Sequence, residues 1–369
     1  MAVFKQPPLV KNPYATQHGR RVLLSYIPYP FVNRSFPNYH PNIETSRTIG
    51  RVISQSGYDL DVYHCMVDEP IDYTQYDVLI GFGNPLENSY KGSYSGRRLL
   101  FAAEAYTEQR HVAELHRLRD LQRRQGVLLP PMRLKPYQDT CNALLSDAII
   151  CLGNAWTTST YRGVFDGPIY RVPNHSHRFF SKADIPRQMD QAKRHFVWIG
   201  GSGAVLKGLD RCIEAFAQMP ALTLHICGPI EKQLLALYAD TLAQAPNIQQ
   251  HGFVDISSAA FKTLVAQAAF MLYPTGSEGA STSVLDVMAG GMIPIMTEQS
   301  GVDGHDFALM LPDAQIDTLV AYCQEAAQKP VQELEQRAEA AYQFVHQHHQ
   351  LSHFHAAFTQ AWQHGVDGP

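Results

Sequence analysis

Short apolar runs alternate with amphipathic stretches along nearly the whole chain, which is typical of a parallel α/β fold. In the first half, apolar runs predict strands at 21–27, 58–65, 76–83, 97–106, 147–153 and 169–174, with a helix at 44–56 and a long basic helix after residue 107. The pattern then starts again. Strands are predicted at 195–201, 221–228, 248–253, 269–275, 293–299 and 307–311, with helices at 209–218, 231–244 and 259–268. The chain therefore predicts two successive Rossmann-like, doubly wound domains.

A polar, proline-bearing segment at 174–194 separates the two series of strands. Linkers between domains have this composition. We therefore expect an N-terminal domain at 1–178, a C-terminal domain at 179–345 and a polar, helical C-terminal segment at 346–369.

Composition narrows the class of protein. The chain has 369 residues, 45% of them hydrophobic, and a formal net charge of -4. That charge gives no general case for nucleic-acid binding. Six scattered cysteines, none in a C-x-x-C pair, read as reduced thiols of a cytoplasmic protein. The N-terminus lacks a secretory apolar region, and no run of about 18 apolar residues predicts a membrane span.

A glycine-rich loop at 199–210 follows the first strand of the second half. It is not a Walker loop, since Lys207 is flanked by Leu206 and Gly208. Leu206 also takes the place of the third glycine of a dinucleotide fingerprint, so an NAD site is disfavoured. The lysine and exposed amides of the loop suit a diphosphate, although a plain strand-to-helix turn is the alternative. The candidate residues are Gly201, Ser202, Gly203 and Lys207.

A second candidate, PTGSEGASTSVLDVMAGG at 274–291, follows the strand at 269–275. Glu278 precedes five small residues, and a helix is expected to begin near Ser283 with free amides at the ligand-facing edge of the sheet. Asp286 is expected to point away from the sheet, because the apolar residues around it cluster on the other side of the helix. An ordinary helix start with an exposed acid is the alternative. The small residues are Gly279, Ala280, Ser281, Thr282 and Ser283.

These segments together resemble the retaining glycosyltransferases of glycosyltransferase family 4, which have the GT-B fold of two Rossmann-like domains facing each other across a cleft. The resemblance is carried by WIGGSGAVLKGLDRCIEAF, LTLHICGP, NIQQHGFV and AAFMLYPTGSEGASTSVLDVMAGGMIPIMTEQSGV, within 196–302. The family's E-x7-E element falls on Glu278 and Asp286, so this chain has E-x7-D. The resemblance implies an N-terminal acceptor domain, a C-terminal donor domain and a last helix that packs back on the N-terminal domain.

The resemblance also assigns roles to residues. Glu278 contacts the donor sugar, Asp286 the ribose and Lys207 the diphosphate, while His111 lies near the sugar. The family's usual loop arginine is absent, since Ser202 and Gly203 stand there, which leaves room for another donor from the first half. The amides of the small residues after Glu278 complete the pocket, and the base is placed at Gly252, Phe253 and Val254.

The implied reaction is glycosyl transfer from a nucleoside diphosphate sugar, such as a UDP- or GDP-sugar, to a glycan or lipid-linked acceptor in polysaccharide or glycoconjugate biosynthesis. The acceptor attacks on the leaving-group face, and Glu278 positions the sugar without acting as a nucleophile. Asp59 and Asp61 spell the D-x-D of metal-dependent transferases, but they fall inside a predicted strand, so we expect neither a metal nor a cofactor. A sugar-nucleotide 2-epimerase of the same fold and a degenerate, non-catalytic binding protein are the alternatives.

Two features of the first half concern the acceptor. The loop at 28–43 offers His40 and Asn42 for acceptor or phosphate contact, or is a plain surface loop. In the basic helix, Val112, Leu115, Leu118 and Leu121 form an apolar stripe flanked by arginines. Through the segment 108–135 this helix could lie on an anionic membrane at the inner face of the cell, or pack on its own sheet by that stripe.

Overall fold

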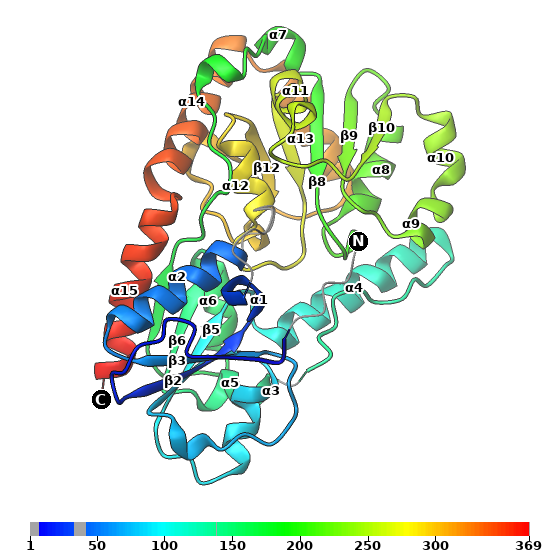
Figure 1. Cartoon of the computed structure of the whole chain (residues 1–369). Helices are drawn as coiled ribbons and strands as arrows, with labels where there is room; N and C mark the ends of the chain where they lie inside the picture. The colour runs from blue at the N-terminus through cyan, green and yellow to red at the C-terminus, as the bar shows by residue number, and fades with distance from the viewer. Residues whose placement is uncertain (1–6, 33–41, 138, 369) are drawn as a thin grey trace. The chain divides into compact units, whose positions relative to one another are not determined.

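The computed structural model describes residues 7–32, 42–137 and 139–368. It contains two compact α/β units (Figure 1). One comprises Met1–Thr107, Lys135–His175 and Leu351–Pro369, and the other Glu108–Leu134 and Ser176–Gln350. The units interleave along the sequence, since the chain changes unit after Thr107, Leu134, His175 and Gln350.

The first unit contains a seven-stranded sheet of order β1-β3-β2-β4-β5-β6-β7, in which β1 is antiparallel and the others are parallel. All strands predicted in the first half are confirmed, and the short edge strand β1 was missed. The strands are β1 (Leu9–Lys11), β2 (Arg21–Tyr26), β3 (Asp59–His64), β4 (Val78–Gly81), β5 (Arg97–Ala102), β6 (Ala148–Leu152) and β7 (Ile169–Val172).

The last helix of the chain completes the core of the first unit. Phe354, Phe358 and Trp362 of α15 (Leu351–Asp367) are at most 1% exposed and join the apolar side chains of β2, β3 and β5. α15 also contacts α2 (Asn42–Gln55), beside which it lies in Figure 1. The remaining helices of this unit are α1 (Tyr29–Val32), α3 (Asn84–Glu87), α5 (Thr140–Leu145) and α6 (Ala155–Arg162).

The second unit contains an all-parallel sheet of order β10-β9-β8-β11-β12-β13. The predicted strands are again confirmed. They are β8 (His195–Ile199), β9 (Thr223–Cys227), β10 (Ile248–Gly252), β11 (Phe270–Tyr273), β12 (Ile293–Thr297) and β13 (Leu309–Leu311). Both faces of this sheet are covered by helices, which explains why β11 and β12 consist entirely of buried residues.

The helices predicted in the second unit are confirmed with one difference, and the helices at 189–192 and 316–328 were missed. The predicted helix at 231–244 is two helices that meet at Tyr238, whose ring is buried and whose hydroxyl donates to Glu214. The helices are α4 (Thr107–Gln125, of which the first residue belongs to the first unit), α7 (Met189–Ala192), α8 (Leu209–Ala217), α9 (Lys232–Leu237), α10 (Ala239–Gln244), α11 (Ala259–Gln267), α12 (Thr282–Met288), α13 (Ile316–Gln328) and α14 (Val331–His348).

The basic helix α4 packs on the second unit. Only Leu118 and Leu121 of the predicted apolar stripe are buried, whereas Val112 and Leu115 are 51% and 48% exposed. The stripe divides because residues three apart drift around a helix with 3.6 residues per turn. No helix in the described ranges combines the length and apolar character that crossing a bilayer requires.

Candidate functional site

The site lies where the strand order of the second unit reverses. The chain proceeds from β8 outward through β9 and β10, and then returns to place β11 on the other side of β8. In open parallel sheets, ligands bind beyond the carboxyl ends of the strands at such a reversal. Both predicted loops lie there, since the glycine-rich loop follows β8 and the Glu278 loop follows β11.

A glycine allows the two loops to meet. Gly208 has a φ of +77°, and a Cβ there would lie 2.7 Å from the carbonyl oxygen of Pro274. A side chain at this position would therefore be strained and would collide with backbone. This approach places Lys207, the preceding residue, beside the loop that carries Glu278.

Lys207 and Glu278 form an ion pair, so the structure brings these two predicted site residues together. Their side chains are 9% and 12% exposed. The Tyr273 hydroxyl, at the end of β11, lies 3.2 Å from Lys207 Nζ and donates a 3.0 Å hydrogen bond to Glu278 Oε1. The three groups form a compact, largely buried polar cluster at one edge of the sheet.

The cluster is electrostatically matched. Burial alone would favour the neutral forms, but the charge of Glu278 outweighs it and raises the pKa of Lys207. Against the same effect of burial, the charges of Lys207 and Arg133 lower the pKa of Glu278. Both groups are therefore charged at neutral pH, so the site offers one fixed cation and one fixed anion.

The glycine-rich loop has a carboxylate partner that the sequence did not suggest. Glu231, just before α9, accepts hydrogen bonds from the amides of Gly203 at 2.5 Å and Ala204 at 3.4 Å. An acid therefore occupies amide donors of the kind predicted to bind a diphosphate. Gly201 and Ser202 are exposed.

Asp286 differs most from its expected surroundings. The alternative of an exposed acid is wrong, because Asp286 is 5% exposed. Its Oδ1 accepts 2.8 Å hydrogen bonds from the Ser176 hydroxyl and the His177 amide, and its Oδ2 lies 3.4 Å from His177 Nδ1. The segment at 176–177 runs beside α12 and takes up the carboxylate, a pairing over more than a hundred residues that no local pattern reveals.

The helix after Glu278 begins at Thr282, one residue before the predicted start, with Ser281 as its N-cap residue. The Ser281 amide donates to the carbonyl of Ser300 at 2.9 Å. Thr282 and Ser283 are half-buried. Gly279 and Ala280 connect Glu278 to this helix, and the carbonyl of Gly279 lies against Gly301.

The predicted base-binding residues end the edge strand β10. Gly252 is its last residue, and its carbonyl accepts a 2.7 Å hydrogen bond from the Gly228 amide. Phe253 follows with 61% of its surface exposed, and Val254 packs against the core. These residues lie at the carboxyl edge of the same sheet as Lys207, two strands away.

The other predicted residues have separate environments. His40 lies outside the described residues, and Asn42 is the first residue of α2. His111 is on α4, with Nδ1 3.9 Å from Glu108 Oε2. Asp59 and Asp61 lie in β3, as predicted; Asp59 accepts from Thr16 and Asp61 from Tyr76. Within the described ranges, no group of three or more His, Cys, Asp or Glu residues is arranged to hold a metal ion.

Helix α4 contributes residues that sequence reasoning missed. Gln109 accepts a 2.8 Å hydrogen bond from the Ser277 hydroxyl, and Arg117 donates at 2.9 Å to the carbonyl of Pro274. Arg133, shortly after this helix, lies against Gly203. Segments distant in sequence therefore support both loops of the site.

The arrangement of the two sheets defines the fold class. The chain is an α/β protein with two Rossmann-like parallel-sheet units, as in GT-B glycosyltransferases. Residues 193–329, which include Lys207, Glu278 and Asp286, match the family model described as glycosyl transferases group 1. No curated protein sequence matches the chain.

Solved structures agree on the fold. Sucrose-phosphate synthase from Thermosynechococcus elongatus is 11% identical with a TM-score of 0.64, over 93% of this chain and 98% of that one. WaaG, a glycosyltransferase involved in lipopolysaccharide biosynthesis, is 15% identical with a TM-score of 0.55, over 94% and 100%. HepE from Anabaena, solved in complex with UDP and glucose, is 11% identical with a TM-score of 0.57, also over 94% and 100%.

Proposed function

We propose that the chain is a retaining, metal-independent glycosyltransferase of glycosyltransferase family 4 that transfers a sugar from a nucleoside diphosphate sugar to a glycan or lipid-linked acceptor. The observation that carries the proposal is the Lys207–Glu278–Tyr273 cluster at the strand-order reversal, inside the segment that matches glycosyl transferases group 1.

The charges of the cluster suit this reaction. Lys207 is the fixed cation, and a diphosphate that reaches it replaces Glu278 as its partner. Glu278 is then released to position the donor sugar and to stabilise positive charge on its ring. The bond from the anomeric carbon to the diphosphate breaks, the bond from that carbon to the acceptor hydroxyl forms, and the hydroxyl proton passes to the departing diphosphate oxygen.

The rest of the donor site extends along the same edge of the sheet. Phe253 is exposed beside β10, where its ring is available to stack on the base. Asp286 contacts the ribose, and it must then share its carboxylate with Ser176 and His177. The glycine-rich loop holds the diphosphate through Gly201, Ser202 and Gly203, and the diphosphate then replaces Glu231 as the acceptor of the Gly203 amide. The amides of Ser281–Ser283 contribute to the same pocket. HepE, bound to UDP and glucose, supports a UDP-sugar as the first donor to test.

We assign the acceptor side to residues from the first half of the chain. His111 contacts the sugar, and Asn42 and His40 contribute to acceptor binding. We place the enzyme in the cytoplasm, consistent with its six free cysteines, in polysaccharide or glycoconjugate biosynthesis. Val112 and Leu115 are exposed on α4 beside exposed arginines such as Arg119, which supports peripheral contact of the segment 108–135 with an anionic membrane.

Nucleotide binding by the full-length chain tests the proposal. UDP, GDP, ADP and CDP are compared by thermal shift at about a hundredfold their dissociation constants, where a specific ligand adds about 2.7 kcal/mol to the stability. We expect one of them to stabilise the wild type and the exposed control Lys232→Met. Lys207→Met should lose most of this effect. Equal stabilisation of Lys207→Met would remove the diphosphate role, and no stabilisation of the wild type would contradict the proposal.

Product analysis with the corresponding diphosphate sugar separates the alternatives. A transferase releases the nucleoside diphosphate and yields a glycoside with the donor's anomeric configuration in the presence of EDTA. Interconversion of the donor sugar without an acceptor would instead identify a 2-epimerase. Binding without either reaction would identify a non-catalytic protein, and activity that EDTA abolishes and Mg²⁺ or Mn²⁺ restores would contradict metal independence.

A further inference from the structure

The glycine-rich loop carries one cation for a ligand that carries several negative charges. Between Gly200 and Gly208 its only basic residue is Lys207, which is already paired with Glu278. A diphosphate is best held by several donors, and a guanidinium is well suited because its planar fork can bind two phosphate oxygens at once. The position of a second cation around this loop therefore matters.

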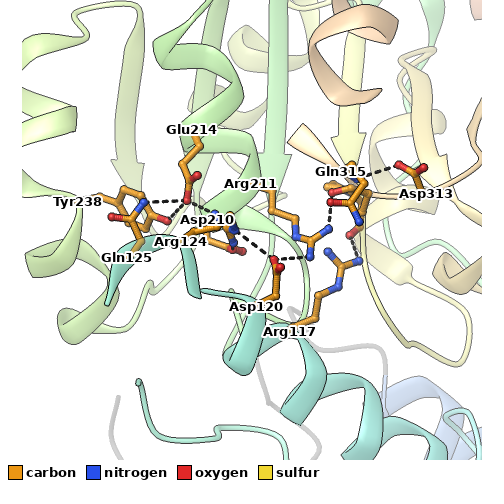
Figure 2. A network of polar contacts seen from close by, with 12 residues as sticks. Arg117, Asp120, Arg124, Gln125, Asp210, Arg211, Glu214, Tyr238, Asp313 and Gln315 are labelled. Atoms are coloured by element: carbon orange, nitrogen blue, oxygen red, sulfur yellow. Dashed lines mark hydrogen bonds and ion pairs between the residues drawn. The ribbon is translucent and has the colours of Figure 1, made fainter. Parts of the chain in front are cut away.

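Helix α4 places several arginines in the second unit. Arg124 of α4 pairs with Asp210 at 2.5 Å and with Glu214, both on α8, while Asp120 of α4 accepts from Arg211 at 2.7 Å (Figure 2). These pairs, with buried Leu118 and Leu121, fix α4 on α8, the helix that directly follows the glycine-rich loop.

A buried carboxylate then holds the segment after α4. Glu114 is 2% exposed, and its Oε1 accepts from the amides of Met132 at 2.7 Å and Arg133 at 2.9 Å. Its Oε2 accepts a further 3.0 Å hydrogen bond from the Arg133 amide. The carboxylate of Glu114 therefore holds the backbone of Arg133 in place, and both of its oxygens take part in these hydrogen bonds.

The side chain of Arg133 lies directly on the glycine-rich loop. A Cβ built at Gly203 would lie 2.4 Å from Arg133 Cγ and 2.8 Å from its Cδ, and Gly203 has a φ of +87°. The loop thus has glycine where any side chain would displace the arginine. The charge of Arg133 also acts on both members of the central pair, because it lowers the pKa of Glu278 and opposes the rise of that of Lys207.

We propose that Arg133 supplies the second cation for the diphosphate, in place of an arginine within the glycine-rich loop, and that Glu114 is its positioning residue. This inference rests on the proposed function, because it assigns a further contact to the same donor. Lys207 approaches the diphosphate from the end of the loop, and Arg133 approaches across Gly203. The alternative is that Arg133 only braces the loop.

Calorimetric titration of the full-length chain with UDP, UMP, GDP and GMP distinguishes these roles. For the base that binds, we expect Arg133→Met to weaken the diphosphate about 10- to 100-fold, the usual effect of losing a hydrogen bond to a charged group. Binding of the monophosphate should weaken far less, so the ratio of the monophosphate to the diphosphate dissociation constant, which measures the preference for the diphosphate, should become smaller. Arg133→Lys should retain part of that preference, and Glu114→Gln should narrow it to a smaller extent.

Arg194→Met, at an exposed position just before β8, is the matched control and should bind as the wild type does. If Arg133→Met weakens both nucleotides equally, or neither, the inference is overturned and the proposed function stands. If the wild type binds no nucleoside diphosphate at all, both are overturned.

Discussion

At the scale of single residues, Lys207 and Glu278 hold each other as an ion pair. Each is buried by the loop that carries the other, and each keeps its charge because of its partner. Under the proposed function, a nucleoside diphosphate competes with Glu278 for Lys207, whereas the donor sugar needs Glu278 itself. The two requirements can be separated by a neutral substitution of nearly the same shape.

We predict that Glu278→Gln binds the free nucleoside diphosphate at least as tightly as the wild type but transfers sugar about 100-fold more slowly, the loss typical of one preorganised electrostatic contact. Titration calorimetry and turnover with the diphosphate sugar measure the two effects. The exposed Glu325→Gln should change neither quantity. Loss of diphosphate binding in Glu278→Gln would show that the carboxylate does more than restrain Lys207.

The sequence indicated both residues as site candidates because each follows an apolar strand, and parallel strands bring their carboxyl ends to one edge of a sheet. It could not predict Glu231 on the glycine-rich loop, or Ser176 and His177 on Asp286. Those contacts depend on how separate loops pack, and no local periodicity encodes them. For Arg133, the sequence indicated only that another donor from the first half of the chain could replace the absent loop arginine. It did not identify the residue.

At the scale of elements, the sequence predicted α4 as a basic helix. It did not predict that arginines of this helix form ion pairs with α8. Arg124 contacts Asp210 and Glu214, and Asp210 is 1% exposed. Burial raises the pKa of Asp210 even beside Arg124, so this carboxylate depends strongly on its cation. The network in Figure 2 is therefore a structural use of basic residues that, in sequence, resemble a membrane-binding face.

We predict that Arg124→Leu lowers the free energy of unfolding by about 3–5 kcal/mol, because it leaves the buried carboxylate of Asp210 without its ion-pair partner. Urea unfolding at neutral pH measures this change. Arg123→Leu, one residue away and exposed, should stay within about 0.5 kcal/mol of the wild type. Equal effects of the two substitutions would mean that the network does not stabilise the docked helix.

Three adjacent strands of the second unit carry a row of histidines. His225 of β9 lies 3.0 Å, nitrogen to nitrogen, from His195 of β8 and from His251 of β10. Burial, and then the two neighbouring imidazoles, lower the pKa of His225 to about 4. In the unfolded chain its pKa is about 6.5, so between these values only the unfolded chain binds the proton. Stability is therefore lost as the pH falls from about 6.5 toward 4.

We predict that this titration removes on the order of 2 kcal/mol of stability between pH 7 and 4.5. His225→Gln should show a correspondingly smaller loss, although it will be less stable at pH 7 because it lacks the imidazole contacts. Urea unfolding at both pH values provides the comparison. His348→Gln, at an exposed position on α14, should lose as much as the wild type, and an unchanged loss in His225→Gln would contradict the assignment.

At the scale of the whole molecule, the sequence predicted two Rossmann-like folds but could not predict how the chain divides between them. Apolar runs identify strands because burial on both faces leaves a local record. The assignment of 108–134 to the second unit depends on Leu118, Leu121 and the α4 ion pairs, which are contacts between distant segments. The domain boundary that we expected at residue 178 stays a prediction. In the structure, the chain passes from the first compact unit to the second after His175.

The interleaving has a testable thermodynamic consequence, because each unit has its own apolar core. Trp362 of α15 is 1% exposed in the core of the first unit, with its ring centroid 5.7 Å from that of Tyr58. Trp362→Ala should cost that unit about 3–5 kcal/mol. Lys207 and Glu278, which we propose to bind the donor, belong to the second unit. In scanning calorimetry, we therefore expect Trp362→Ala to lower the temperature of one unfolding transition and the bound nucleoside diphosphate to raise that of another.

The exposed Leu145→Ala, also in the first unit, should leave the temperatures of both transitions unchanged. A single transition moved by both the substitution and the nucleotide would show that the two cores unfold as one.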